Sequence, residues 1–373
     1  MNKIGVFGTS NKKYEKRIPL HPELFDLIPD RIRKQLFFED KYACELGIKE
    51  SFLNEHFGGV LSRDKLFDQT DVWLLPKPDK NDYQYFSEGK ILWGWPHCVQ
   101  GAEITQAALN AKMTIIAWEA MYGGKDNTHI FYRNNELAGF AAVQHMMMLT
   151  GRNGYFGRKL KAAVMGFGAT ARGAISSLKS MGINDITVFS QRPSYLINAP
   201  IECVNYKKMK VIGNECLLES SPSKAISAAT ELANYDLVVN CILQNPLQPI
   251  NFINENEMGY INKQLDIIDI SCDEGMGFHF ATPTTFDMPM LKINSYINYY
   301  SVDHTPTLYW DSASYEITKS IIEFLPMFVE NCWQKNEVLE GAIEIIDGNI
   351  ANNKIIEFQN RQSTPPYNYL NEK

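Results

Sequence analysis

Short apolar segments recur along the first third of the chain, separated by polar and helix-favouring stretches. Each segment has the length of a strand that is buried on both faces of a parallel sheet. The predicted strands cover residues 3–7, 35–38, 72–75, 91–94 and 114–117, and helical stretches between them cover residues 22–28 and 103–111. This alternation is typical of an α/β domain with a mostly parallel sheet.

A second group of strand-like segments begins in the middle of the chain. Apolar residues from 162 lead into a glycine-containing turn, an apparent helix over 174–181 and a second strand over 185–189. Two further candidate parallel strands cover 236–240 and 266–270. The stretch 193–232 is weakly patterned, and no elements are assigned within it.

The turn in this second group has the spacing of a dinucleotide cradle. Gly166 and Gly168 allow the backbone to bend sharply and to approach a pyrophosphate, and Ala171 completes the Gly-x-Gly-x-x-Ala pattern. Ala169 and Thr170 supply amide groups at the helix N-terminus, where an anion is favoured. An ordinary tight turn can carry the same glycines, but the strand–helix–strand context favours a dinucleotide site.

The end of the following strand indicates which dinucleotide is bound. NAD sites usually place an acidic residue there to accept hydrogen bonds from the ribose 2′-hydroxyl. This chain has Ser190, Gln191 and Arg192 instead, a hydroxyl, an amide and a guanidinium that suit a 2′-phosphate. Arg192 by itself is typical of an ordinary solvated loop arginine, but the missing acid favours NADP(H).

Two long helices are predicted to connect the two groups of strands. Residues 137–150 are apolar nearly all round, which indicates a helix buried on several sides, with His145 and Met146 to Met148 as core residues. Residues 312–332 form a long amphipathic pattern. The predicted fold is therefore α/β, with two Rossmann-like domains that have parallel sheets, are separated by a cleft and are joined by long connector helices.

The expected domains follow from this arrangement. Residues 1–136 with 305–373 form a discontinuous substrate and catalytic domain, and residues 137–304 form the NADP-binding Rossmann domain. The polar end, 360–373, carries Pro365 and Pro366 and is expected to be loosely ordered.

Composition limits the kinds of binding partner that we expect. The net charge is −7 and no long basic run occurs, so we expect no nucleic-acid partner. The seven cysteines are dispersed without a Cys-x-x-Cys pair, which argues against a metal site and a disulfide framework. No signal-like or membrane-spanning apolar run occurs, so we expect a cytoplasmic protein with no membrane partner, and homo-oligomer formation is left open.

Charged side chains follow several of the predicted strands. Arg17 lies in a polar loop after the first strand and could clamp a carboxylate, although a surface arginine would look the same. Lys77 and His97 close neighbouring strands, whose carboxyl ends form the ligand crevice of an open α/β sheet. Glu119, Asp273 and Asp303 also follow apolar strands and could bind a cationic amine or serve as ordinary loop residues.

Together these segments resemble the alanine dehydrogenase/saccharopine dehydrogenase superfamily over nearly the whole chain. The resemblance implies a carboxylate-binding role for Arg17 and catalytic roles for Lys77 and His97. It rests on Glu15, Arg17 and Pro22, on Lys77 and His97, on Gly166, Gly168 and Ala171, and on Asp273, Glu274 and Gly275. The pair His97-Cys98, Glu119 and the segment from Ser301 to Pro306 favour the saccharopine branch.

The tail from Glu344 to Gln359 resembles bacterial N5-(carboxyethyl)ornithine synthases of the same superfamily. That resemblance implies NADPH-dependent condensation of pyruvate, a 2-oxo acid, with the side-chain amine of ornithine or lysine through an imine. Two features depart from the family pattern: Pro78 stands where a glutamate is common, and the stretch 190–192 differs from NAD-using members. A saccharopine dehydrogenase, an alanine dehydrogenase and a non-catalytic NADP sensor remain the alternatives.

Overall fold

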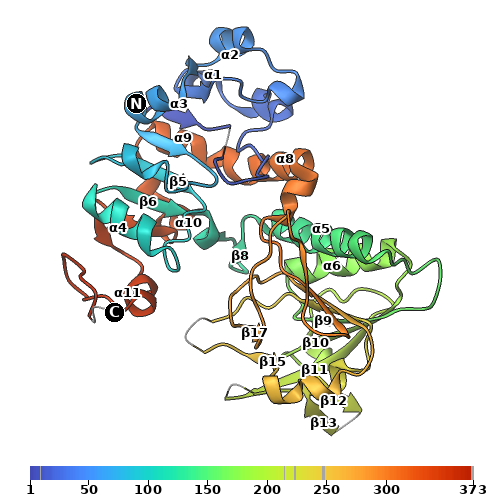
Figure 1. Cartoon of the computed structure of the whole chain (residues 1–373). Coiled ribbons are helices and arrows are strands. Elements are labelled where there is room, and N and C mark those ends of the chain that lie inside the picture. Colours follow the sequence, from blue (N-terminus) through green and yellow to red (C-terminus); the bar gives the residue numbers. More distant parts are fainter. Residues whose placement is uncertain (9, 214, 222–223, 246–247, 371–373) are drawn as a thin grey trace. The chain divides into compact units, whose positions relative to one another are not determined.

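The computed structural model describes residues 1–8, 10–213, 215–221, 224–245 and 248–370. The chain forms two compact units (Figure 1). Unit 1 contains Met1–Phe131 and Tyr309–Lys373, and unit 2 contains Tyr132–Leu308. Each unit is built on its own parallel-rich sheet, so the predicted α/β fold with two Rossmann-like sheets is confirmed.

In the described residues, the sheet of unit 1 has six parallel strands, with two antiparallel strands added at one edge. Across the sheet, the parallel strands lie in the order β3-β2-β1-β4-β5-β6. The strands are β1 (Ile4–Val6), β2 (Leu36–Glu39), β3 (Gly59–Leu61), β4 (Val72–Leu74), β5 (Ile91–Gly94), β6 (Thr114–Ala117), β20 (Ile343–Ile346) and β21 (Asn349–Ile350). The observed β5 and β6 coincide with the predicted strands.

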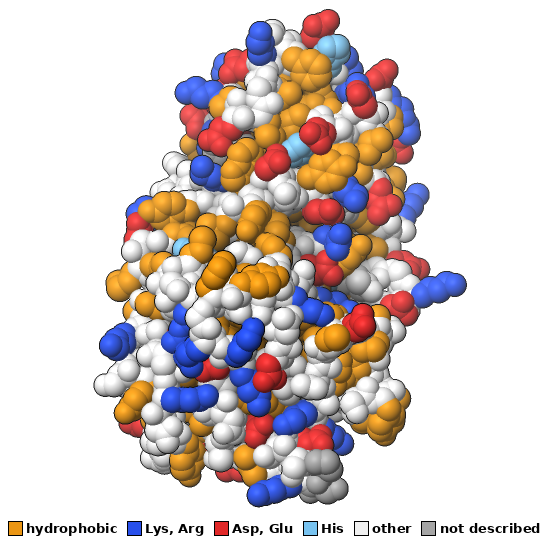
Figure 2. Space-filling model, turned by 90° about the vertical axis from the view of Figure 1, so that its right-hand side faces the viewer, with side chains coloured by type: hydrophobic (Ala, Val, Ile, Leu, Met, Phe, Trp, Pro, Cys, Tyr) orange, Lys and Arg blue, Asp and Glu red, His pale blue; other side chains and the backbone are white. Residues whose placement is uncertain are grey.

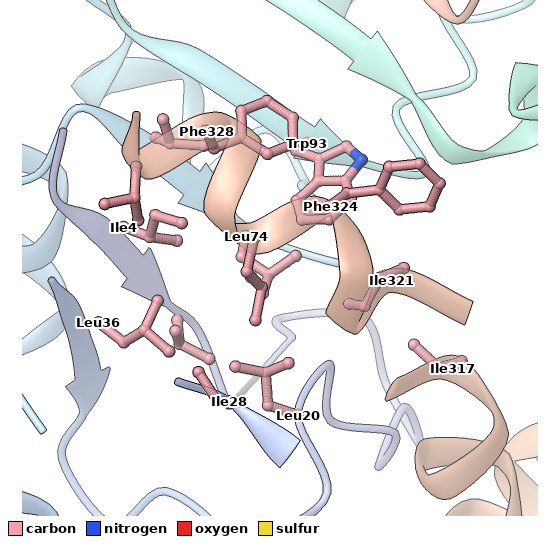
Figure 3. Close-up of a cluster of buried hydrophobic side chains, with 14 of the residues drawn as sticks. Ile4, Leu20, Ile28, Leu36, Leu74, Trp93, Ile317, Ile321, Phe324 and Phe328 are labelled. Carbon is pink, nitrogen blue, oxygen red and sulfur yellow. The ribbon is translucent and has the colours of Figure 1, made fainter. Parts of the chain in front are cut away.

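Both faces of this sheet are covered, which explains the continuous apolar strands. Along β4, Val72 and Leu74 enter one core cluster and Trp73 enters the other, because successive side chains of a strand point to opposite faces. Figure 3 shows the first cluster, where Leu74 and Trp93 meet Ile321 and Phe324. The helices are α1 (Asp30–Arg33), α2 (Glu50–His56), α3 (Arg63–Gln69), α4 (Ala102–Asn110), α8 (Trp310–Ile321), α9 (Leu325–Val329), α10 (Glu337–Glu340) and α11 (Asn353–Gln359).

The sheet of unit 2 repeats the same strand order. Its parallel strands lie as β11-β10-β9-β14-β16-β19, so both sheets have the 3-2-1-4-5-6 order of a Rossmann fold. These strands are β9 (Lys161–Met165), β10 (Asp185–Ser190), β11 (Asn205–Ile212), β14 (Leu237–Asn240), β16 (Leu265–Asp269) and β19 (Ile297–Tyr300). Further strands extend the edges, namely β12 (Glu215–Ser221), β13 (Lys224–Ser227), β15 (Asn251–Ile253), β17 (Gly277–Phe278) and β18 (Met290–Lys292).

Two glycines bring α5 (Tyr132–Thr150) and α6 (Ala169–Ser180) into backbone contact, and the helices run side by side in Figure 1. A Cβ at Gly139 would lie 1.9 Å from the Thr170 carbonyl oxygen, and one at Gly173 would lie 1.7 Å from that of Glu136. Any side chain at these positions would push the two helices apart and so displace the start of α6. The third helix of the unit is α7 (Ala228–Leu232).

Three sequence expectations are wrong. The helix predicted over 312–332 is not continuous: α8 ends at Ile321, and α9 begins at Leu325 with Pro326 in its first turn, where proline has no amide to extend a preceding helix. Met148 is 69% exposed and so is not a core residue. The end of the chain is ordered as far as residue 370, because buried Arg361 bonds Gln106 and the carbonyl of Tyr367. Residues 371–373 lie outside the described residues.

Candidate active site

Three predicted site residues meet at the carboxyl edge of the unit 1 sheet. Lys77 follows β4, His97 follows β5 and Glu119 follows β6, three neighbouring strands. The Lys77 Nζ lies 3.1 Å from His97 Nε2. The His97 amide donates to Glu119 Oε1 over 2.7 Å, and the same oxygen lies 3.7 Å from His97 Nδ1. An amine, an imidazole and a carboxyl therefore form one cluster that can pass a proton between them.

The backbone at His97 is unusual. Its φ is +51°, in the left-handed region that a residue with a Cβ rarely adopts. The hydrogen bond from its amide to Glu119 holds this conformation. Left-handed backbone at non-glycine residues concentrates in functional sites, where the surrounding structure maintains it.

Burial shifts the pKa of the carboxyl group in the cluster. It raises the pKa of Glu119 to about 7, with a further contribution from Glu344, while Lys77 and the His97 amide oppose the rise. Glu119 thus changes charge near neutral pH, beside the two basic groups. A carboxyl in this state can take up or release a proton during a reaction at pH 7.

Arg17 lies next to this cluster and is 5% exposed. Its Nε and Nη2 donate to the Glu15 carboxylate at 2.8 and 2.6 Å, a two-point ion pair. Burial alone would raise the pKa of Glu15, but the charge and hydrogen bonds of Arg17, aided by Lys77, hold it at about 2. The Arg17 guanidinium and the Lys77 ammonium lie 5.0 and 5.4 Å from the ring centre of Trp95. The Trp95 ring thus contacts both cations. Trp95 was not singled out from the sequence, although it stands two residues before His97.

The loop after β1 is tied to the same edge. The Gly8 amide donates to Glu39 Oε2 over 2.8 Å, and Ser10 Oγ donates to the Lys77 carbonyl over 3.0 Å. Glu39 and Asp82 also share Arg63, with N–O distances of 2.9 and 2.8 Å. This network fixes the first loop against the strand end that carries Lys77.

In unit 2 the predicted nucleotide turn has the required backbone geometry. Gly166 has φ +89°, and a Cβ there would lie 3.1 Å from Ile242. Gly168 is the N-cap of α6 and has no atom within 4 Å of its Cβ position. The first bond along the helix is donated by Arg172 to the Gly168 carbonyl, so the amides of Ala169, Thr170 and Ala171 precede it at the positive end of the helix.

A pocket of about 480 Å³ lies beside this turn. Ser190, Gln191 and Arg192 line it together with Gly168, at the place where the adenosine end of a dinucleotide lies in a Rossmann fold. Its lining includes Phe167, Gly168, Arg172, Ser190, Gln191, Arg192, Ile197 and Asn198. The free space at Gly168, the helix N-terminus and the basic side chains fit a dinucleotide.

Arg172 is a pocket residue that sequence reasoning missed. It donates to the carbonyls of Asn198 and Ala199 at 2.8 and 2.9 Å, and its guanidinium lies 4.4 Å from the ring centre of Phe167. Its place in the first turn of the helix that follows the glycine turn could have identified Arg172 from the sequence. Arg172 joins the loop after β10 to α6 and adds a second arginine beside Arg192.

The acids of unit 2 lie around the ends of β16 and β19. Asp269 is completely buried, accepts from Asn240 over 2.9 Å and from the Tyr299 hydroxyl over 2.8 Å, and burial raises its pKa to about 7. Asp303 contacts His304, and burial raises the pKa of Asp273. Both acids act electrostatically on the Cys272 thiol rather than lining the pocket around Arg192. His145 contacts the Tyr300 hydroxyl at 3.0 Å, as expected of a packed histidine.

The described residues contain neither a metal-binding cluster nor a membrane-spanning helix. Within residues 1–370 and outside the stated gaps, no group of three or more His, Cys, Asp and Glu side chains could hold a metal ion. No helix in that part of the chain is long and apolar enough to cross a membrane. Acidic and basic side chains are interspersed with apolar ones on the face shown in Figure 2.

Known proteins are similar to this chain in sequence and in fold. An N(5)-(carboxyethyl)ornithine synthase of Lactococcus lactis subsp. lactis (strain IL1403) is 24% identical over 88% of this chain and 97% of its own length. An alanine dehydrogenase of Mycolicibacterium smegmatis is 20% identical over 76% of each chain. A solved L-alanine dehydrogenase structure superposes with a TM-score of 0.75 at 15% identity, covering 95% of this chain and 98% of its own, which supports the fold.

The model of the alanine dehydrogenase/PNT C-terminal domain matches residues 137–353, more than half of the 373 residues. The resemblance to the alanine dehydrogenase superfamily is therefore confirmed. The relatives named above include alanine dehydrogenases, which are oxidoreductases. The chain belongs to the alanine dehydrogenase/PNT family of oxidoreductases.

Proposed function

We propose that this protein catalyses the NADPH-dependent reductive condensation of a 2-oxo acid, pyruvate, with the side-chain amine of ornithine or lysine. The product is an N-(carboxyalkyl)amino acid. The observation that carries the proposal is the Lys77–His97 contact of 3.1 Å, with Glu119 bonded to the His97 amide. Condensation of an amine with a ketone requires several proton transfers, and this cluster has the groups to make them.

In this proposal, unit 1 binds the substrates and unit 2 binds the cofactor. Arg17 orients the oxo-acid carboxylate by charge and hydrogen bonding, with Glu15 fixing the guanidinium plane. Lys77 and His97 take a proton from the attacking amine nitrogen and give one to the carbonyl oxygen, which forms the carbinolamine. A second proton given to the hydroxyl lets it leave as water, while the nitrogen lone pair forms a protonated imine. Glu119 accepts the hydrogen bond from the His97 amide and so fixes the backbone there. Because its pKa is about 7, it can also exchange protons with Lys77 and His97.

The cofactor assignment is NADP(H). When bound, the reduced nicotinamide supplies the hydride that converts the imine carbon to a saturated centre. Gly166, Gly168 and the amides of residues 169–171 would hold the pyrophosphate. Ser190, Gln191, Arg192 and Arg172 would hold the adenosine 2′-phosphate, since they offer donors and positive charge.

One panel of assays tests this function. Purified protein is mixed with NADPH or NADH, with pyruvate or 2-oxoglutarate, and with ammonia, ornithine or lysine, and each product is identified by mass. We expect NADPH oxidation with pyruvate and ornithine or lysine, and a product that joins the two carbon skeletons. Alanine from pyruvate and ammonia would instead identify an alanine dehydrogenase, and saccharopine from 2-oxoglutarate and lysine a saccharopine dehydrogenase. No turnover in any combination would favour a non-catalytic NADP sensor.

A further inference from the structure

A second cavity lies in unit 1, next to the loop after β1 and the loop after β2. It has a volume of about 190 Å³, and the reaction scheme above uses only Glu15 among its lining residues. Its other lining residues include both charged and apolar side chains. The ones that matter here are Ser10, Lys16, Ile18, Lys41, Glu45 and Trp310.

The charged part of this cavity contains both signs. Lys16 and Lys41 are exposed cations, and Glu45 is an exposed anion. The carboxylate of Glu15 also lines the cavity but is committed to Arg17 by two hydrogen bonds. A ligand that carries a carboxylate and an ammonium on one carbon would match a cavity whose lining includes two lysines and a glutamate.

The loop that carries Lys41 and Glu45 is held in a demanding conformation. Lys41 and Ala43 have φ values of +61° and +52°, in the left-handed region. The Lys41 amide donates to Glu50 over 3.1 Å, and the Tyr42 hydroxyl accepts from the Leu20 amide and donates to its carbonyl, at 2.9 and 2.7 Å. Anchored loops with such backbone are typical of ligand clamps.

The cavity adjoins the reacting cluster through Glu15. That residue lines the cavity, bonds Arg17 and is influenced by the charge of Lys77, so the two places are neighbours in the same unit. Ser10, another lining residue, donates to the Lys77 carbonyl. A molecule seated in the cavity could therefore extend a chain of a few methylene groups toward Lys77 and His97.

We propose that this cavity binds the α-amino-acid head group of the amine substrate. Lys16 and Lys41 take its α-carboxylate, Glu45 takes its α-ammonium, and Ile18 and Trp310 contact the methylene groups. The inference rests on the proposed function and deepens it, because it explains how an amine at the end of a side chain, rather than ammonia, is selected. It adds to that function the residues that would recognise the α-amino and α-carboxylate groups of the diamino acid.

Kinetics of a charge-removing variant test the proposal. Lys41→Met keeps the length of the side chain and does not alter the backbone requirement, since both residues have a Cβ. We expect the KM for ornithine to rise at least tenfold, the KM for pyruvate to stay unchanged, and the preference for ornithine over propylamine to fall at least tenfold. Lys65→Met, an exposed lysine on α3 of the same unit, is the matched control and should change neither KM. An unchanged KM for ornithine in Lys41→Met, or an equal rise in Lys65→Met, would overturn the assignment.

Binding measured without cofactor separates this inference from the proposed reaction. Trp310 lines the cavity, so ornithine should change the protein fluorescence in a saturable way, and 1,4-diaminobutane, which lacks the carboxylate, should not. The signal should disappear in Trp310→Phe and shift at least tenfold to higher ornithine concentration in Lys41→Met. Saturable binding without any turnover would refute the proposed reaction alone. Turnover with a diamine response equal to that of ornithine would refute the head-group site alone.

Discussion

The two units share one strand order but differ in the segment after their first strand. In unit 2, β9 passes through Gly166 and Gly168 directly into α6, a helix of 12 residues. In unit 1, β1 ends at Val6, and the next helical element, a 3₁₀ helix, begins only at Pro22. The strand order places ligands at the carboxyl edge in both sheets. The residues after the first strand decide whether that edge offers helix amides to a phosphate or side chains to a reaction.

The edges also differ in how they handle charge. The unit 1 edge collects ionisable groups that face one another, with Lys77, His97 and Glu119 in direct or near contact. The unit 2 edge offers backbone amides at the turn, and its strands β14, β16 and β19 carry a buried network of Asn240, Asp269 and Tyr299. Proton transfer suits the first arrangement, and anion binding without proton exchange suits the second.

Removal of the Lys77 amine should have the largest effect on turnover. Because Lys77 lies in unit 1, cofactor binding by unit 2 should not change. We expect Lys77→Met to lower kcat by about 10²–10⁴-fold, the range for a positioned acid–base group, with the Kd for NADPH unchanged. Steady-state kinetics and a fluorescence titration with NADPH measure the two quantities. Exposed Lys80→Met is the control. Full turnover in folded Lys77→Met would refute its proton-transfer role, and a tenfold weaker Kd would refute the division of labour between the units.

Asp269 should make the stability of unit 2 depend on pH. Its pKa rises by burial from 3.8 to about 7, so the folded state holds a proton that the unfolded state has already lost. This contribution is complete below pH 4 and is lost as the pH rises through 7, by at most about 4 kcal/mol. In Asp269→Asn, urea unfolding midpoints should decline less between pH 5 and 8 than in the wild type. Parallel declines in the two proteins would contradict the assignment.

Filling the space at Gly168 should damage only the nucleotide site. The backbone there is extended, with φ −97° and ψ −166°, and nothing lies within 4 Å of a Cβ, so Gly168→Val can fold. A bound pyrophosphate would collide with the new side chain, and we expect the Kd for NADPH to rise about tenfold or more. Gly259→Val, at another uncrowded glycine of unit 2, should leave the Kd unchanged. Calorimetric titration measures the Kd for NADPH in both variants. A Kd of Gly168→Val equal to that of the wild type would show that the pyrophosphate does not bind at this turn.

The smallest expected effect concerns the choice of cofactor. Arg192→Ala should lower kcat/KM for NADPH about tenfold, since one charge-assisted contact with the 2′-phosphate is worth roughly 1.5 kcal/mol. The value for NADH should not change and acts as the internal reference. A uniform fall with both cofactors would mean that Arg192 supports the pocket without reading the phosphate.

Residues 91–94, 114–117 and 185–189 were predictable as strands because strands covered on both faces must be apolar along their length. The stretch 193–232 was not. It contains β11, whose residues alternate irregularly between exposed and buried, and the antiparallel strands β12 and β13 at the margin of the sheet. Partly exposed strands tolerate lysine and serine, so their pattern resembles that of a loop. The order in the polar end, 360–370, was not predictable for a different reason, since Arg361 bonds Gln106, which is distant in sequence.

The sequence by itself determined the local features: apolar strands, the glycine turn, the absence of an acid after Phe189, and the charged residues at strand ends. These depend on the conformational preferences of a few adjacent residues. Only the tertiary structure decided that Lys77 and His97 touch, that Arg17 is buried against Glu15 and above Trp95, and that Arg172 reaches the pocket beside Arg192. Such contacts depend on which strands become neighbours and on how far each loop folds back, and both are set by packing across the whole sheet.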